Sequence, residues 1–102
     1  APALVIIREL LALGAKVHIH DPIALPAVRK QLGSTVDYFE NAYEALKGAE
    51  AWMVVTEWNE FRRPDFDRIL KLMKQPVLFD GRNIYDAKEM RDRGFSYYGI
   101  GR

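Results

Sequence analysis

Two short and almost wholly apolar runs constrain the fold of this chain more than any other feature. Residues 51–56 and 76–80 are rich in branched and aromatic side chains, and polar or glycine-bearing sequence follows each run. Continuous apolar runs of this length are typical of strands that are buried on both faces of a parallel sheet. We therefore expect both runs to be buried strands, joined by a helix over residues 65–74.

Helical and strand patterns alternate along the whole chain. Apolar residues at helical spacing, often with glycine after the last turn, predict helices at residues 2–13, 27–32, 42–47, 65–74 and 88–93. Short branched or apolar stretches predict strands at residues 17–21, 36–39, 51–56, 76–80 and 95–101. This order predicts an α/β domain with a mainly parallel sheet, in which right-handed crossovers place helices on both faces.

Local signals mark the ends of several helices. The first predicted helix opens at Pro2 and stops at Gly14, with an apolar stripe formed by Leu4, Ile7, Leu10, Leu11 and Leu13. Asn41 stands three residues before Glu44, which is the spacing of a capping box. We therefore expect Asn41 to cap the third helix.

Composition excludes several classes of function. The chain has 102 residues, which suits a single domain. Its net charge is +1, so we expect no nucleic-acid partner and no membrane surface. Its lack of cysteine excludes disulfides, thiolate catalysis and cysteine zinc sites within these residues and fits a reducing, cytoplasmic compartment.

The carboxyl ends of the predicted strands are where a ligand is expected to bind, because open α/β sheets bind ligands at that edge. Three segments with polar residues follow the predicted strands at that edge: residues 20–22, 56–58 and 80–83. Arg82 is the strongest candidate, because it follows a glycine at the end of a buried strand and its guanidinium can hold a phosphate bidentately. The alternative is a capping salt bridge from Arg82 to Asp80 or Asp86.

Two other groups of residues allow a functional and a structural interpretation. Glu57 and Trp58 can hydrogen-bond and stack on a base or a sugar, although a tryptophan just past a strand more often packs against the next helix. His18 and His20 lie on one face of a predicted strand. A metal would need a third ligand in register, and the sequence marks none, so we interpret both histidines as structural or surface residues and expect no metal.

Motifs of several common enzyme classes are missing from the sequence. It contains no G-x-G-x-x-G turn for a nicotinamide cofactor, no P-loop and no G-x-S-x-G. The residues alone therefore predict a small α/β module with an anion-binding edge.

Two segments resemble a known family. Residues 56–62 read T-E-W-N-E-F-R, and residues 79–86 read F-D-G-R-N-I-Y-D. With the opening P-A-L, the strand ending H-D-P and the closing G-F-S-Y-Y-G-I-G-R, they resemble the C-terminal domain of the UDP-glucose/GDP-mannose dehydrogenase family over nearly the whole chain. The tryptophan in the first segment is more similar to the UDP-glucose branch.

The resemblance implies a three-part, homo-oligomeric enzyme. In this family a Rossmann domain binds NAD, a central helical region forms the dimer, and the C-terminal domain closes over the UDP-sugar. The enzyme oxidises UDP-glucose to UDP-glucuronate in two NAD-dependent steps through a cysteine thioester. Residues 1–102 would then be the UDP-sugar-binding domain, with the remaining domains as partners, and would by themselves bind no NAD and catalyse no reaction.

The resemblance also assigns the site and a missing strand. Arg82 matches the family's arginine that contacts the sugar nucleotide, and Asn83, Glu57 and Trp58 are carried over as its neighbours. The Rossmann-like strand order 3-2-1-4-5-6 would lack its first, central member, which leaves a gap of about 10 Å. We therefore expect a distorted or associating domain with weak affinity for UDP.

A second hypothesis is a non-catalytic α/β protein-interaction module. In that interpretation the aromatic residues Trp58, Phe61, Tyr97 and Tyr98 form a protein contact. A receiver-like signalling domain is weaker, because it needs clustered acids at the first strand's end and only Asp21 is present there.

Overall fold

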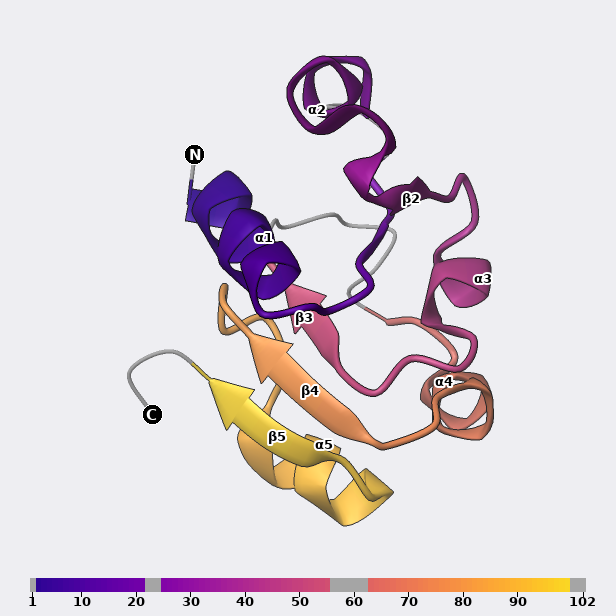
Figure 1. The fold of residues 1–102 in the computed structure, drawn as a ribbon. Helices are drawn as coiled ribbons and strands as arrows, with labels where there is room; N and C mark the ends of the chain where they lie inside the picture. The colour runs from indigo at the N-terminus through magenta and orange to yellow at the C-terminus, as the bar shows by residue number, and fades with distance from the viewer. Residues whose placement is uncertain (1, 22–24, 56–62, 100–102) are drawn as a thin grey trace. The chain divides into compact units, whose positions relative to one another are not determined.

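A computed structural model describes residues 2–21, 25–55 and 63–99 of the chain, and these divide into two compact units, Ala1–Ala45 and Leu46–Arg102. Helices and strands alternate in both units, and every strand pair is parallel (Figure 1). The predicted α/β class with parallel sheets is therefore confirmed. No helix in these three ranges has the length and apolar character needed to cross a bilayer.

The first unit is built on a two-stranded parallel sheet. It contains α1 (Pro2–Ala12), β1 (His18–Ile19), α2 (Leu25–Leu32), the 3-10 turn η1 (Gly33–Thr35), β2 (Asp37–Tyr38) and all but the last residue of α3 (Ala42–Leu46). Strand β1 pairs with β2 with His18 opposite Asp37. The small core of this unit consists of Ile19, Leu32 and Val36, with Leu4, Ile7 and Leu11 of α1 packed against it.

The predicted apolar stripe of the first helix is correct except at its end. Leu13 is 85% exposed, because α1 already stops at Ala12 and Leu13 lies beyond the last helical turn. Gly14 follows with a φ of +89°, a left-handed conformation that glycine adopts without steric cost. The predicted glycine stop is therefore confirmed.

Side-chain caps begin the short helices as the sequence indicates. The side-chain oxygen Oδ1 of Asn41 accepts hydrogen bonds from the N–H groups of Tyr43 and Glu44, at 2.8 and 3.3 Å, which confirms the predicted N-cap. Asp65 and Asp86 cap the two helices of the second unit in the same way.

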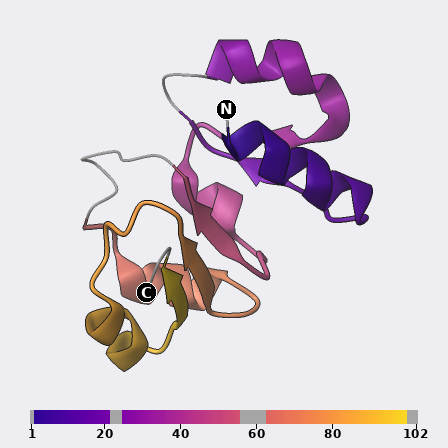
Figure 2. The ribbon, with the colours of Figure 1, turned by 90° about the vertical axis from the view of Figure 1, so that its left-hand side faces the viewer.

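The second unit is a three-stranded parallel sheet with two crossover helices (Figure 2). It contains β3 (Trp52–Val54), α4 (Phe66–Leu72), β4 (Val77–Asp80), α5 (Ala87–Arg93) and β5 (Ser96–Gly99). The strand order is β3-β4-β5, and the register places Trp52 opposite Leu78 and Leu78 opposite Tyr97. The strands are shorter than predicted, although each lies inside its predicted range.

The prediction that β3 and β4 are buried on both faces is wrong. Trp52 and Leu78 are 7% and 0% exposed, whereas their neighbours Met53 and Phe79 are 38% and 39% exposed. The chain moves in one direction from β3 to β4 to β5, so right-handed crossovers bring α4 and α5 to the same face of the sheet. Helices α4 and α5 cover that face, and the opposite face, which neither helix covers, is the open face of this unit.

The described strands pair within the two units. The described strands form two separate sheets, β1-β2 and β3-β4-β5, rather than one. In the Rossmann-like order 3-2-1-4-5-6 these are the neighbours on either side of member 1, and the absence of that member stays a prediction. The expected distortion or association of the domain remains a prediction.

Candidate functional site

The loop between β4 and α5 carries the candidate arginine, and a glycine fits this loop to the neighbouring strand. The N–H of Gly81 donates to the carbonyl oxygen of Val54 at the end of β3, at 2.8 Å. A Cβ atom at position 81 would lie 2.9 Å from the same oxygen, closer than van der Waals contact allows. Glycine is therefore required here by the close approach of the β3 backbone.

Asp80, the last residue of β4, holds the loop through hydrogen bonds to its carboxylate. Asp80 is 1% exposed, and both of its carboxylate oxygens are hydrogen-bonded. Oδ1 accepts the N–H of Arg82 at 3.1 Å, and Oδ2 accepts the N–H of Tyr85 at 2.9 Å and the hydroxyl of Tyr97 at 2.8 Å. These donors offset the cost of burying the carboxylate and tie both ends of the loop to one side chain.

The remaining residues of the motif complete the turn into α5. Asn83 has a φ of +53°, and asparagine is one of the few residues that adopt this conformation readily. Tyr85 is 4% exposed and its ring contacts Trp52 and Phe66. Asp86 then accepts the N–H of Glu89 at 2.9 Å as the N-cap of α5. The identities of Asn83, Tyr85 and Asp86 are therefore explained by the shape and packing of the turn.

Arg82 lies where the sequence predicted, at the carboxyl end of β4 in an exposed position. The two carboxylates considered as its alternative partners, Asp80 and Asp86, accept hydrogen bonds from backbone N–H groups of the loop and of α5. The predicted position of Arg82 at the carboxyl end of β4 is confirmed, and the binding roles of Arg82 and Asn83 stay predictions.

The other predicted site residues have two different outcomes. Glu57 and Trp58 lie outside the described residues, as does Phe61. His18 and His20 are described, and Nδ1 of each ring is hydrogen-bonded to a backbone carbonyl, of Ala45 at 2.9 Å and of Phe39 at 3.0 Å. Within residues 2–21, 25–55 and 63–99, no group of three or more potential ligands is arranged to hold a metal.

Tyr97 and Tyr98 were predicted together as part of a protein contact, and the structure separates them. Tyr97 is 2% exposed, with its hydroxyl bonded to Asp80, so its role as a contact residue is wrong. Tyr98 points to the other face of the sheet, where it is 56% exposed and stacks on Phe79 with ring centroids 5.2 Å apart. The alternation of side chains along β5 is the reason for this difference.

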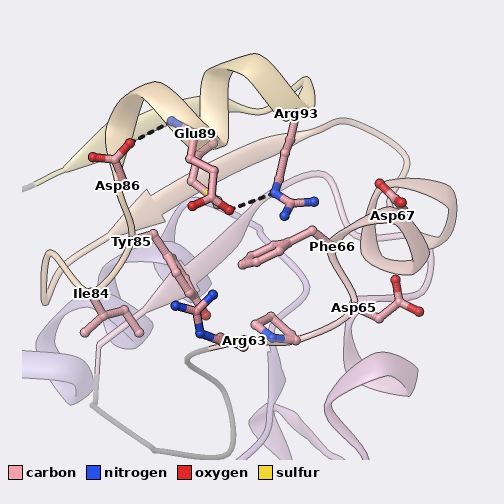
Figure 3. A pocket seen from close by; sticks show the side chains of 11 residues that line it. Arg63, Asp65, Phe66, Asp67, Ile84, Tyr85, Asp86, Glu89 and Arg93 are labelled. Carbon is pink, nitrogen blue, oxygen red and sulfur yellow. Dashed lines mark hydrogen bonds and ion pairs between the residues drawn. The ribbon is translucent and has the colours of Figure 1, made fainter.

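A pocket of about 420 Å³ lies between α4, α5 and the second half of the same loop (Figure 3). Its lining includes Ile84, Tyr85 and Asp86 but neither Arg82 nor Asn83. Several of its polar groups are engaged with one another. Glu89 pairs with Arg93 at 3.0 Å, and the guanidinium of Arg93 lies 4.8 Å from the ring centroid of Phe66. The pocket therefore does not coincide with the candidate ligand edge.

Sequence reasoning missed the hydrogen bond between Asp80 and Tyr97. The two residues are 17 positions apart and lie on neighbouring strands. An acidic residue at the end of an otherwise apolar strand was the available signal, because a buried carboxylate needs donors.

Comparison with known proteins decides the family. Residues 1–87, which include the motif at residues 79–86, match the UDP binding domain of the UDP-glucose/GDP-mannose dehydrogenase family. The chain belongs to this family. The resemblance predicted from the two sequence segments is therefore confirmed.

Relatives in this family are much longer than the chain. It is 41% identical over its whole length to the UDP-glucose 6-dehydrogenase TuaD of Bacillus subtilis (strain 168), of which it covers 22%. It is 42% identical to the UDP-glucose 6-dehydrogenase of Pseudomonas aeruginosa, of which it covers 24%. The chain thus spans about a quarter of the length of these curated family members.

A solved structure shows the same fold. The NDP-N-acetyl-D-galactosaminuronic acid dehydrogenase from Methanosarcina mazei Go1 matches 99% of the chain with a TM-score of 0.78 and 25% sequence identity. The match covers 20% of that protein. The chain is thus similar to one part of a larger nucleotide-sugar dehydrogenase.

Proposed function

We propose that this chain is the C-terminal UDP-sugar-binding domain of a UDP-glucose 6-dehydrogenase. The observation that carries the proposal is the loop after β4, which presents an exposed arginine at the carboxyl end of a parallel strand and belongs to the segment matched by the family. Ligands of open α/β sheets bind at this edge.

In the proposed complex Arg82 holds the nucleotide. A guanidinium offers a planar fork of N–H donors that matches two phosphate oxygens, so Arg82 binds the diphosphate of the UDP-sugar. Asn83 supplies an amide beside it. Glu57 and Trp58 follow the neighbouring strand β3 in sequence and complete the site as hydrogen-bonding and stacking neighbours.

The oxidation itself belongs to other parts of the proposed enzyme. UDP-glucose is converted to UDP-glucuronate with NAD through a cysteine thioester, and this chain contains no cysteine and no dinucleotide-binding glycine motif. The chain therefore contributes substrate binding, while the remaining domains of a homo-oligomer bind NAD and supply the nucleophile.

Replacing the arginine tests the proposal. Titration of the chain with UDP up to millimolar concentration, followed by amide chemical shifts, should perturb residues 80–85. Arg82→Ala should weaken this binding by about 10- to 100-fold, because it removes a charge-assisted hydrogen bond to phosphate.

A matched variant controls for charge. Lys88→Ala also removes one cation from the same unit, but its side chain is exposed on α5 and pairs with Asp92. It should leave UDP binding within about twofold of the original chain, since a surface ion pair contributes little. Equal affinities of the Arg82→Ala and Lys88→Ala variants would contradict the assignment of Arg82.

A further inference from the structure

The proposed function assigns no role to the buried carboxylate of Asp80 in the second unit. Among the residues that the structure describes, Asp80 is a charged residue that lies buried in the core. Carboxylates are rarely buried without a specific role, because the desolvation cost must be offset by well-placed donors. Here two of the donors to its carboxylate are backbone N–H groups of the loop that carries Arg82, and the third is the hydroxyl of Tyr97.

Hydrogen bonds fix the backbone on both sides of Arg82. Before Arg82, the N–H of Gly81 donates to the carbonyl oxygen of Val54 at 2.8 Å. The N–H of Arg82 itself donates to Oδ1 of Asp80 at 3.1 Å. After it, the N–H of Tyr85 is held by the other oxygen of Asp80 at 2.9 Å. The Cα atom from which the guanidinium extends is therefore placed by the end of β3 and the end of β4 together.

Tyr97 of β5 connects a third strand to this arrangement. Its hydroxyl lies 2.8 Å from Oδ2 of Asp80 and 3.2 Å from the carbonyl oxygen of Tyr85, so it bridges the carboxylate and the far end of the loop. The Arg91 side chain donates to the carbonyl oxygen of Tyr97 at 3.0 Å and helps to hold β5 in place.

We propose that Asp80 and Tyr97 are positioning residues that preorganise Arg82 for the phosphate groups of the ligand. This inference rests on the proposed function, because it assigns to these residues an effect on UDP that acts through Arg82. A loop that is ordered before binding loses less conformational entropy on binding, and this difference appears as affinity.

Tyr97→Phe tests the positioning role with the loss of a single oxygen atom. In the chain without ligand, the amides of Arg82 and Tyr85 should exchange with solvent about tenfold faster, because Asp80 loses one of its anchors. The affinity for UDP should fall by about 3- to 10-fold. Asp80→Asn should lower the affinity for UDP more than Tyr97→Phe does. The asparagine side chain places an NH₂ donor opposite one of the backbone N–H groups that the carboxylate accepts.

Tyr98→Phe is the matched control. It removes the same hydroxyl group from the adjacent residue, whose ring lies on the open face of the sheet and stacks on Phe79. Neither the exchange of the loop amides nor the affinity for UDP should change. Equal exchange rates in the Tyr97→Phe and Tyr98→Phe variants would overturn the proposal.

A double-mutant cycle separates positioning from general destabilisation. Tyr97→Phe should weaken UDP binding in the original chain and have less than about a twofold effect in the Arg82→Ala background, because residues that act as a unit are not additive. Equal effects of Tyr97→Phe in both backgrounds would overturn the positioning role and leave Arg82 as the ligand-binding residue. Unchanged affinity in Arg82→Ala alone would overturn the proposed function and, with it, the positioning role.

Discussion

The two faces of the β3-β4-β5 sheet are built from the same three strands and have opposite environments. On one face Trp52, Leu78 and Tyr97 are at most 7% exposed beneath α4 and α5. On the other face Met53, Phe79 and Tyr98 are between 38% and 56% exposed. Both sets are apolar or aromatic, so side-chain hydrophobicity does not distinguish them.

The difference between the faces shows that burial in this unit is set by the path of the chain. Two right-handed crossovers that advance in the same direction place both helices on one side. Aromatic residues on the covered face pack against residues of the helices and loops, as Trp52 does with Tyr85 and Phe95. On the open face the rings of Phe79 and Tyr98 stack on each other.

The largest expected difference between the faces is in core packing. Leu78→Ala should lower the free energy of unfolding by about 2–5 kcal/mol, because it leaves a cavity in a fully covered position. Phe79→Ala, one position away on the open face, should cost less than about half as much, since water already reaches its ring. Urea unfolding followed by circular dichroism measures both, and equal losses would show that the open face is packed as tightly as the covered one.

A smaller difference is expected from the two tyrosine hydroxyls. Tyr97→Phe should lower the free energy of unfolding by about 1–2 kcal/mol, because its buried hydroxyl bonds to the Asp80 carboxylate. Tyr98→Phe should change it by no more than about 0.5 kcal/mol. Thermal unfolding of the two variants checks this, and a cost for Tyr98→Phe as large as that of Tyr97→Phe would contradict the assignment of faces.

The smallest effect concerns the contact between strands on the open face. The rings of Phe79 and Tyr98 lie 5.2 Å apart at an interplanar angle of 20°. A double-mutant cycle with Phe79→Ala and Tyr98→Ala should give a coupling of about 0.5–1 kcal/mol in urea unfolding. A coupling near zero would mean that the stacked arrangement contributes nothing to the stability of this face.

Local signals in the sequence predicted much of the fold. The cap at Asn41 and the glycine stop at Gly14 depend on residues within one helical turn, so they can be recognised without knowing the rest of the structure. The position of Arg82 at a strand exit was predictable for the same reason, because an apolar run followed by a glycine marks where a buried strand ends. Strand ends were less accurate, since pairing partners rather than the strand's own residues decide where a ladder stops.

The sequence by itself determined the order of helices and strands, the resemblance to the family, and the loop on which the candidate arginine lies. Only the tertiary structure decided which apolar side chains are covered, and that the carboxylate of Asp80 meets the hydroxyl of Tyr97 from another strand. The physical reason is distance along the chain. Helix caps and strand exits are set by neighbours a few residues away, whereas burial and the bond between β4 and β5 depend on segments brought together by the crossover between them.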